Sequence, residues 1–324
     1  MINMKTKVQN RSTKNDPVIR ALPEACADEE AAVEFVERMR WGGHPACPHC
    51  GDTDVYQMMN TNNTARQANY RWRCRGCKAQ FTVRIGTVFE DSRIELRHWC
   101  FAFWRASTSK KGVSALEIHR QTGVSYKSAL FMLHRIRYAM SESAPAMLGQ
   151  DCGDVEVDET YVGGKPRYRG TSKRGRGTKK QCVLALVERN GSVKTKPIAN
   201  VSAKTLQTAI RQNVDGSARI VTDENSAYTG IGKHYARGHQ TVCHSAHEYV
   251  RGDVYSNTVE SFFATVKRGI NGIYHSVSKE HLSLYLSEYE FGHNNRNLED
   301  GERTAAAIRK AQGKRLLYKQ PVTR

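Results

Sequence analysis

The sequence has no long hydrophobic run. No stretch of its 324 residues approaches the roughly 18 consecutive apolar residues that a membrane helix needs. The opening segment, MINMKTKVQNRSTKND, also lacks the apolar core of a signal peptide. We therefore expect a cytoplasmic protein with no membrane partner.

Acidic residues are scarce compared with basic ones. The chain has 32 Asp and Glu against 50 Lys and Arg, a formal net charge of +18, and the basic residues recur in blocks along its whole length. A polyanion such as nucleic acid is the partner that this imbalance favours. The length predicts two or three domains. Residues 1–22 are basic and show no apolar periodicity, which predicts a disordered arm.

The nine cysteines do not show the even spacing of a secreted disulfide framework. Four of them form two Cys-x2-Cys pairs, and two such pairs typically hold one tetrahedral structural zinc ion. The expected zinc ligands are Cys47, Cys50, Cys74 and Cys77. Four thiolates leave no open coordination position, so this metal has no expected catalytic role.

Short strand-like segments at 54–57, 70–73 and 80–83 predict a zinc ribbon around these cysteines. An amphipathic helix that begins near Pro23 precedes it, so residues 23–90 form the first predicted domain. We expect this ribbon to present its basic side chains to DNA or to a partner subunit. These are Arg66, Arg71, Arg73, Arg75 and Lys78.

Residues 91–142 carry a helical pattern with a glycine turn. Thr122-Gly123-Val124 separates two short amphipathic segments, which is typical of a helix-turn-helix. Lys127 and Arg135 on the second segment are the expected DNA contacts. A helical hairpin in an ordinary bundle would show the same pattern.

A predicted strand follows a turn-rich link at 141–151, and a segment rich in Lys and Arg follows the strand. Val155 and Val157 alternate with Glu156 and Asp158, and then eight Lys or Arg fall between positions 165 and 180 with no acidic residue among them. A carboxylate beside a cationic loop suits metal ions and a polyanion. The expected DNA contacts of the loop are Lys173, Arg174, Arg176, Lys179 and Lys180.

Two further acidic positions complete a candidate metal site. Asp223 ends the apolar segment 219–222, where ligands gather in α/β sheets. In the segment 256–268, one helical face is apolar and another carries Asn257, Glu260 and Lys267. Asn257 and Glu260 could also be an ordinary capping pair. Together with Asp158 and Asp223, however, Glu260 is suited to bind magnesium.

The order of these motifs is recognisable. VDETYVGG, VTDENSAY, SNTVESFFATVKRGINGIYH and a late FGHNNR together resemble the catalytic domain of ISXO-like insertion-sequence transposases, members of the DDE superfamily. The resemblance spans residues 30–297. It implies an α/β fold with a ribonuclease H-like mixed sheet flanked by helices at 151–297. The zinc ribbon and helix-turn-helix region would precede this domain, and a basic tail at 298–324 would follow it.

The resemblance also implies a chemistry. A DNA transposase of this family would catalyse metal-dependent cleavage and strand transfer of insertion-sequence ends, with Asp158, Asp223 and a third residue binding two Mg²⁺ or Mn²⁺ ions. Glu260 precedes Lys267 by seven residues, like the acid and base of the family's terminal motif. Asn257 is the rival third ligand. Double-stranded DNA, at the terminal inverted repeats and the target, and other copies of the chain in a synapsed homo-oligomer would be the partners.

Two other classes of protein fit part of the sequence. A zinc-ribbon and helix-turn-helix regulator without catalysis would explain residues 40–140 and the net charge but would leave the three acidic residues without a role. A structure-specific nuclease would explain the acidic residues but does not need an N-terminal unit that reads DNA sequence.

Overall fold

The structure is a computed structural model, and it describes residues 15–142, 146–163, 180–248 and 250–317. The chain divides into two compact units. The first contains residues 1–109, 114–140 and 295–320, and the second contains residues 110–113, 141–294 and 321–324. Among the described residues, no helix has both the length and the apolar character needed to cross a membrane.

Two helices open the first unit. Asp16 caps α1 (Pro17–Ala27) by accepting hydrogen bonds from the Val18 and Ile19 backbone N–H groups. Asp28 begins α2 (Glu29–Trp41) by accepting from the Ala31 backbone N–H at 2.8 Å. The expectation of a disordered arm to residue 22 is therefore wrong from Pro17 onward, because an Asp cap followed by Pro at the first position starts a helix there.

The C-terminal segment also differs from the expected basic tail. Residues 300–309 form α9 (Asp300–Arg309), which packs against α1 and α3 (Leu96–Thr108). Its Gly301 N–H donates to Asp16 Oδ2 at 2.8 Å. Glu299 and Glu302 form a capping box, and Ala305, Ala307 and Ile308 are buried. The capping box and the apolar spacing are a sequence signal that would have identified this helix.

The zinc-ribbon region contains a small antiparallel sheet in the order β1 (Val55–Gln57), β2 (Trp72–Cys74), β3 (Gln80–Phe81). Trp41 contacts Trp72 and Phe81 edge-on, with ring centroids 5.7 and 6.1 Å apart. β1 and β3 lie within the predicted segments 54–57 and 80–83, and β2 overlaps the predicted segment 70–73 but ends one residue after it.

A helical pair follows in the same unit. Ser114 caps α4 (Ala115–Thr122), Gly123 ends it with a φ of 74°, and α5 (Tyr126–Met140) begins three residues later. The positive φ is accessible to glycine without strain, which explains the residue at this turn.

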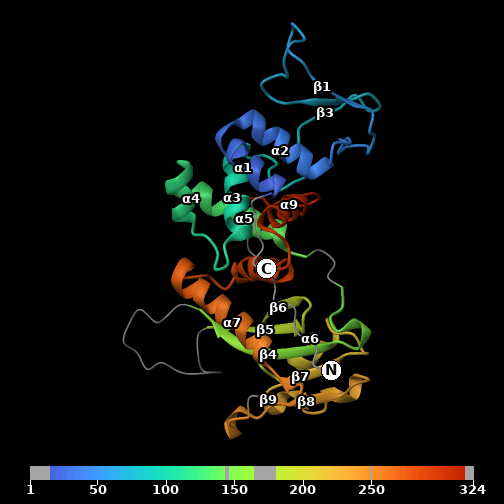
Figure 1. Ribbon diagram of the computed structural model, residues 1–324, viewed down its shortest axis with the longest axis vertical. Coiled ribbons are helices and arrows are strands. Elements are labelled where there is room, and N and C mark those ends of the chain that lie inside the picture. Colours follow the sequence, from blue (N-terminus) through green and yellow to red (C-terminus); the bar gives the residue numbers. More distant parts are fainter. Residues whose placement is uncertain (1–14, 143–145, 164–179, 249, 318–324) are drawn as a thin grey trace. The chain divides into compact units, whose positions relative to one another are not determined.

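The second unit is built on a five-stranded mixed sheet (Figure 1). Its order is β6 (Val193–Ile198), β5 (Gln181–Glu188), β4 (Asp154–Val162), β7 (Arg219–Thr222), β8 (His239–Thr241). β4, β5 and β6 are antiparallel, whereas β7 and β8 run parallel to β4. A two-stranded ribbon, β9 (Val250–Arg251) with β10 (Val254–Tyr255), precedes the helix α7 (Asn257–Gly269).

Helices cover both faces of this sheet. α6 (Ala203–Arg211) packs on one face over a core that includes Val155 and Val157. α7 (Asn257–Gly269) and α8 (Leu282–Asn294) pack on the other face, and Figure 1 shows α7 beside β4 and β5. Because side chains alternate along β4, Glu156 and Asp158 lie on the α7 face.

Side chains of α8 cover the edge strand β6. Asn294 Oδ1 accepts from the Val193 N–H at 2.7 Å, and its Nδ2 donates to the Val193 carbonyl at 3.2 Å. One turn earlier, Glu290 Oε1 accepts from the Thr195 N–H at 2.5 Å. These bonds satisfy backbone groups that an open sheet edge would leave unpaired.

Glu290 should make stability depend on pH. Burial raises the pKa of its carboxyl from the ordinary 4.5 to about 7, although Thr195 and Lys194 act in the opposite direction. The folded state therefore binds the proton more tightly than the unfolded chain. The resulting stabilisation is complete below about pH 4.5 and is lost as the pH rises through about 7.

Denaturant unfolding of Glu290→Gln at pH 5 and pH 8 tests this. The difference in unfolding free energy from the wild type should change by up to about 3 kcal/mol in favour of the variant at the higher pH. Glu24→Gln, at an exposed position on α1, should show no such change. A pH-independent difference for Glu290→Gln would contradict the prediction.

Candidate active site

The four predicted zinc ligands lie together in the first unit. Cys47 Sγ is 3.7 Å from Cys77 Sγ, Cys50 Sγ is 3.6 Å from Cys74 Sγ, and all four sulfur atoms lie within 4.8 Å of one another. A tetrahedral zinc ion with Zn–S bonds of about 2.3 Å requires S···S separations of about 3.8 Å. The cysteines therefore fit a closed zinc site.

Cys77, in the second cysteine knuckle, lies in a setting that favours its thiolate form. The Ala79 backbone N–H, followed by the Cys50 thiol, lowers the pKa of Cys77 to about 7. Metal ligation requires deprotonated cysteines, so a hydrogen bond that stabilises the thiolate favours binding.

Arg66 is not presented to DNA or to a partner subunit, contrary to expectation, because it is buried against Glu37. Its guanidinium pairs with Glu37 on α2, with Nη1–Oε2 and Nη2–Oε1 distances of 3.1 and 2.8 Å, and its side chain is only 7% exposed. Trp72 Nε1 donates to the same carboxylate at 2.7 Å. Glu37 thus anchors the ribbon to α2, and Arg66 is structural. Sequence spacing did not indicate this, because Glu37 is 29 residues from Arg66.

Asp158 and Asp223 lie side by side on the second unit's sheet. β4 and β7 are parallel neighbours with Glu156 opposite Val221. Asp158 lies two residues further along β4, and Asp223 directly follows Thr222, the last residue of β7. This register, and the charge of Asp223 acting on Asp158, place the two carboxylates near each other. Neighbouring strands are about 4.8 Å apart. The fold thereby brings together two acids that are 65 residues apart in the chain.

The electrostatics of Asp158 reflect this crowding. Burial raises its pKa to about 7, and the charges of Glu159, Asp223 and Glu260 add to the effect. Burial also raises the pKa of Asp223. A cation between these groups would relieve the repulsion, and carboxylate oxygens are the ligands that Mg²⁺ and Mn²⁺ prefer. The donor set therefore fits divalent metal ions.

Glu260 comes from the first turn of α7 and is partly solvated. Its Oε1 lies 3.3 Å from Ser256 Oγ and 3.3 Å from His244 Nε2, and its side chain is 48% exposed. Among the described residues, only the four cysteines form a group of three or more ligand atoms within 4.8 Å of one another. The charge of Glu260 thus acts on Asp158. The carboxylates of Asp158, Asp223 and Glu260 do not all lie within 4.8 Å of one another.

The acidic neighbours of the two aspartates have other partners. Glu159 accepts from Asn225 Nδ2 at 2.8 Å and from the Tyr228 hydroxyl. Glu224 accepts from the backbone N–H groups of His244 and Ser245 at 3.0 and 3.1 Å. In the pairs Asp158-Glu159 and Asp223-Glu224, each glutamate is engaged in hydrogen bonds that stabilise the surrounding loops. The aspartates are therefore the better candidates for metal ligands.

Asn257 and Lys267 are both exposed on α7. Lys267 lines a pocket of about 300 Å³ at the end of β4, together with Lys180, Gly163 and Asn271. The pocket thus brings two lysines together where α7 lies beside the end of β4.

The residues expected to contact DNA differ in their exposure. Lys127 is exposed in the first turn of α5. Arg135 is buried, and its Nη1 donates to the Val88 and Glu90 carbonyls at 2.8 and 2.9 Å, so it is a structural residue and not a surface contact. The remaining loop residues, Lys173, Arg174, Arg176 and Lys179, lie outside the described residues.

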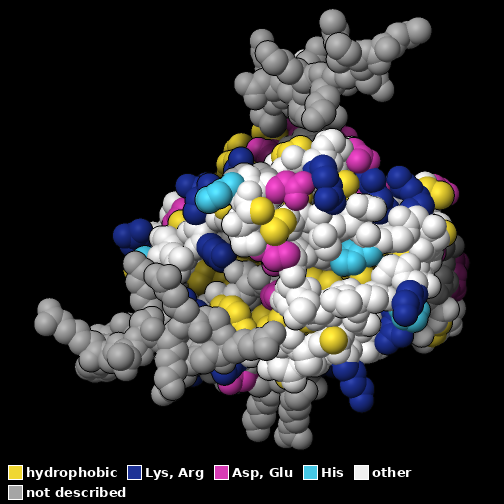
Figure 2. All heavy atoms as spheres, turned by 90° about the horizontal axis from the view of Figure 1, so that it is seen from below, with side chains coloured by type: hydrophobic (Ala, Val, Ile, Leu, Met, Phe, Trp, Pro, Cys, Tyr) yellow, Lys and Arg dark blue, Asp and Glu magenta, His cyan; other side chains and the backbone are white. Residues whose placement is uncertain are grey.

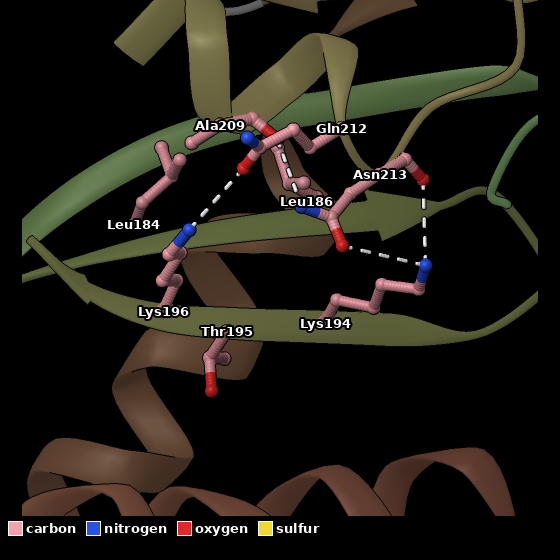
Figure 3. A pocket seen from close by; sticks show the side chains of 8 residues that line it. All are labelled: Leu184, Leu186, Lys194, Thr195, Lys196, Ala209, Gln212 and Asn213. Carbon is pink, nitrogen blue, oxygen red and sulfur yellow. Dashed lines mark hydrogen bonds between the residues drawn. The ribbon is translucent and has the colours of Figure 1, made fainter. Parts of the chain in front are cut away.

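A second pocket, of about 310 Å³, lies on the opposite face of the sheet (Figure 3). Lys194 Nζ lies 3.5 Å from the Asn213 carbonyl, and Lys196 Nζ lies 3.4 Å from Gln212 Oε1. Both lysines therefore interact with the C-terminal end of α6, where cations are favoured. This pocket is separate from the carboxylates and is explained by helix capping.

Glu156 lies two residues before Asp158 on β4 and binds Arg189, and the sequence did not identify Glu156 or Arg189 as part of this site. Glu156 is fully buried on the face that carries Asp158, and Arg189 Nε donates to it at 2.8 Å. The alternation of acidic and apolar residues along 154–158 was the available signal, but it did not separate a ligand from a supporting residue.

Known proteins resemble both units. Residues 152–294 match the model of the ISXO2-like transposase domain, and residues 27–80 match that of the transposase zinc-ribbon domain. A Halobacterium salinarum protein in the transposable element ISH50, itself uncharacterized, is 28% identical over 279 residues, which are 81% of this chain and 90% of that protein.

Two further matches are weaker. An uncharacterized transposase-like protein of Haemophilus influenzae is 29% identical over 107 residues, covering 32% of this chain and 81% of that protein. Among solved structures, a pre-cleavage Mos1 transpososome matches with a TM-score of 0.28 and 12% identity, over 62% of this chain and 71% of that chain.

The two family models describe a transposase domain and a transposase zinc-ribbon domain, and together they cover more than half of the chain. The motifs around Asp158, Asp223 and Glu260 lie within the first match, and the four cysteines lie within the second. This chain therefore belongs to the zinc-ribbon-containing ISXO2-like transposases of the DDE type.

Proposed function

We propose that this transposase cleaves the ends of an insertion sequence and joins them to target DNA, using two divalent metal ions held by Asp158, Asp223 and Glu260. The observation that carries the proposal is the placement of Asp158 on β4 and of Asp223 at the end of the neighbouring strand β7, with Asp223 and Glu260 both acting on Asp158 by charge. A ribonuclease H-like fold for this unit is supported by the sheet order, with three antiparallel strands followed by two parallel ones.

In this proposal, the chain's own residues bind the metal ions and fix their positions. Asp158 and Asp223 supply oxygen ligands from a rigid sheet, and α7 supplies the third ligand from the helix packed over it. Divalent ions at such a site activate the attacking oxygen and stabilise the leaving oxygen of a phosphodiester. Of the two rivals, Glu260 is the better third ligand, because its charge acts on Asp158 whereas an amide cannot neutralise a cation.

The path of the DNA follows from the cationic groups. Lys180 and Lys267 share the pocket at the end of β4, three residues beyond Asp158 at Tyr161. About 10 Å of strand separates these two positions along β4. We propose that this pocket holds a phosphate beside the scissile one and that Lys267 assists as a phosphate ligand.

Sequence recognition is assigned to the first unit. The exposed first turn of α5, with Tyr126 and Lys127, has the position that base-reading residues take in a helix-turn-helix. In Figure 2, Lys and Arg side chains are scattered over the visible face with acidic side chains among them.

The test is a cleavage and joining assay with the full chain. The DNA substrate carries the terminal inverted repeats that flank the gene, and the assay is run with Mg²⁺, with Mn²⁺ or with a chelator. Nicking at the repeat ends and joined products that require the metal support the proposal. Specific binding without any cleavage would favour a DNA-binding regulator, and cleavage of any DNA without joining would favour a structure-specific nuclease.

The basic loop should supply affinity that depends strongly on salt. Replacing three of its residues by Ala should weaken binding to all DNA, because each lost phosphate contact removes released counterions. The slope of log K against log salt should fall in magnitude by about 2 to 3. The loop variant replaces Lys173, Arg174 and Arg176, and the control replaces the exposed Lys204, Lys233 and Lys279.

Both variants lose the same formal charge, so the comparison separates direct contacts from net charge. The control should change the slope by less than the loop variant. A loop variant that prefers a different sequence, or that shows the same slope as the control, would contradict this assignment.

A further inference from the structure

α7 begins without a cap of its own. Ser256 occupies the N-cap position but makes no capping hydrogen bond to the helix. Its hydroxyl instead donates to Glu260 Oε1 at 3.3 Å. The first N–H groups of a helix have no partner within it and must be satisfied from elsewhere when they are buried.

Glu156 from β4 supplies that cap. Its Oε2 accepts from the backbone N–H groups of Thr258 and Val259 at 2.8 and 3.1 Å. Its Oε1 accepts from Thr258 Oγ1 at 3.0 Å and from Arg189 Nε at 2.8 Å. Glu156 is fully buried, and both of its carboxylate oxygens accept hydrogen bonds. Its negative charge lies at the N-terminus of α7, where the helix dipole favours an anion.

Arg189 holds this carboxylate in place. Its other nitrogens donate to Asp154 Oδ2 at 2.9 Å and to the carbonyls of Asp253 and Tyr255 at 2.6 Å each. Its guanidinium also lies 3.7 Å from the Tyr255 ring centroid. The residues just before α7 are therefore tied to β4 through the same side chain that fixes Glu156.

The arrangement connects the two sides of the active site. Glu156 and Asp158 point from the same face of β4, about 6.6 Å apart along the strand. The residues that Glu156 caps, Thr258 and Val259, immediately precede Glu260. One buried carboxylate thus links the strand that carries Asp158 to the turn that carries Glu260.

Apolar packing alone does not set this spacing. Val259, Phe262, Phe263 and Val266 orient α7 about its axis against the sheet. The hydrophobic effect that buries this stripe is not directional. Hydrogen bonds at the helix end have defined lengths and directions, so they determine the axial position.

We propose that Glu156, oriented by Arg189, is a positioning residue that holds α7 so that Glu260 stays near Asp158 and Asp223 and can share in binding the metal ions. The role rests on the proposed function, because it concerns the same metal site. It predicts that weakening the cap lowers metal affinity without altering DNA binding.

The test is Mn²⁺ binding by the zinc-loaded full chain without DNA, measured by electron paramagnetic resonance. Sites present in the wild type and absent in Asp158→Asn define the signal. Glu156→Gln should weaken binding at those sites by about 10- to 100-fold, as is typical when a residue that supports a metal ligand is changed. Hydrogen exchange should also become faster in peptides that contain Thr258 and Val259, but not in those from α8.

Asp16→Asn is the matched control. Asp16 is likewise a buried carboxylate, only 4% exposed, that caps a helix through two backbone N–H groups, but it lies in the first unit, directly before α1. It should leave Mn²⁺ affinity unchanged. Equal weakening by both variants would mean general destabilisation and would overturn the positioning role.

Thr258→Val provides a milder test if Glu156→Gln does not fold. It removes one 3.0 Å hydrogen bond to Glu156 with little change in volume, and it should weaken Mn²⁺ binding several-fold. Wild-type affinity in either folded variant overturns the inference. A wild type that binds no Mn²⁺ overturns the proposed function itself, whereas the exchange measurement separately reports whether Glu156 caps α7.

Discussion

Asp158→Asn and Asp223→Asn should each abolish cleavage and strand transfer while leaving binding to the element ends intact. Each removes a carboxylate from the proposed metal site, and metal ions contribute several kcal/mol to transition-state stabilisation in such reactions. The expected loss of rate is on the order of 10³-fold or more. Single-turnover cleavage and an electrophoretic binding assay measure the two quantities.

Stability provides an internal control for Asp158→Asn. Burial and neighbouring carboxylates raise the pKa of Asp158 to about 7, so its ionised form is unfavourable in the metal-free protein at pH 8. Replacing it by a neutral amide should leave the unfolding free energy equal to that of the wild type or higher at this pH. Loss of activity together with loss of folding would not support a catalytic role.

The third ligand can be distinguished on the same helix. Glu260→Gln should be as damaging as the aspartate changes, because an amide does not neutralise metal charge, and Asn257→Ala should be milder. Full activity in Glu260→Gln with loss in Asn257→Ala would reverse the assignment. Full activity in Asp158→Asn, or activity without any metal, would rule out the catalytic proposal and favour the DNA-binding regulator.

Removal of a zinc ligand should have the second large effect. The purified chain should carry one zinc ion, and Cys74→Ser should lose it and unfold the ribbon. Cys74 is fully buried, and structural zinc contributes roughly 10 kcal/mol or more to folding in small domains. Elemental analysis and hydrogen exchange over residues 45–83 provide the measurements.

The consequences should extend to α2. Glu37 on that helix is 8% exposed and binds both Trp72 and Arg66 from the ribbon. Loss of the ribbon removes both partners and leaves a buried carboxylate, which is costly. Zinc chelation should therefore also change the fluorescence of Trp41, which packs on Trp72.

Cys243→Ser is the matched control for the zinc experiment, because Cys243 lies in the second unit and outside the cysteine group. It should keep its zinc and its stability. Well-folded wild-type protein without zinc, or unchanged stability in Cys74→Ser, would exclude the site.

Local sequence patterns by themselves determined the features that depend on neighbouring residues. The Cys-x2-Cys spacing identified the zinc ligands, since each knuckle is a tight local turn. The apolar stripe of α7 and the Asn190-Gly191 hairpin between β5 and β6 were also predictable. In these cases the periodicity of one element, or the preference of one turn, specifies the structure without reference to distant residues.

Only the tertiary structure decided the roles of charged residues. Arg66, Arg135 and Glu156 look like surface charges in the sequence, yet each is buried against partners from elsewhere in the chain, at separations of 29, 47 and 102 residues. Likewise, Asp158 and its neighbour Glu159 are distinguished only by the face of β4 on which each lies. A buried charge requires a compensating partner, and the fold, not the local sequence, brings that partner within hydrogen-bonding distance.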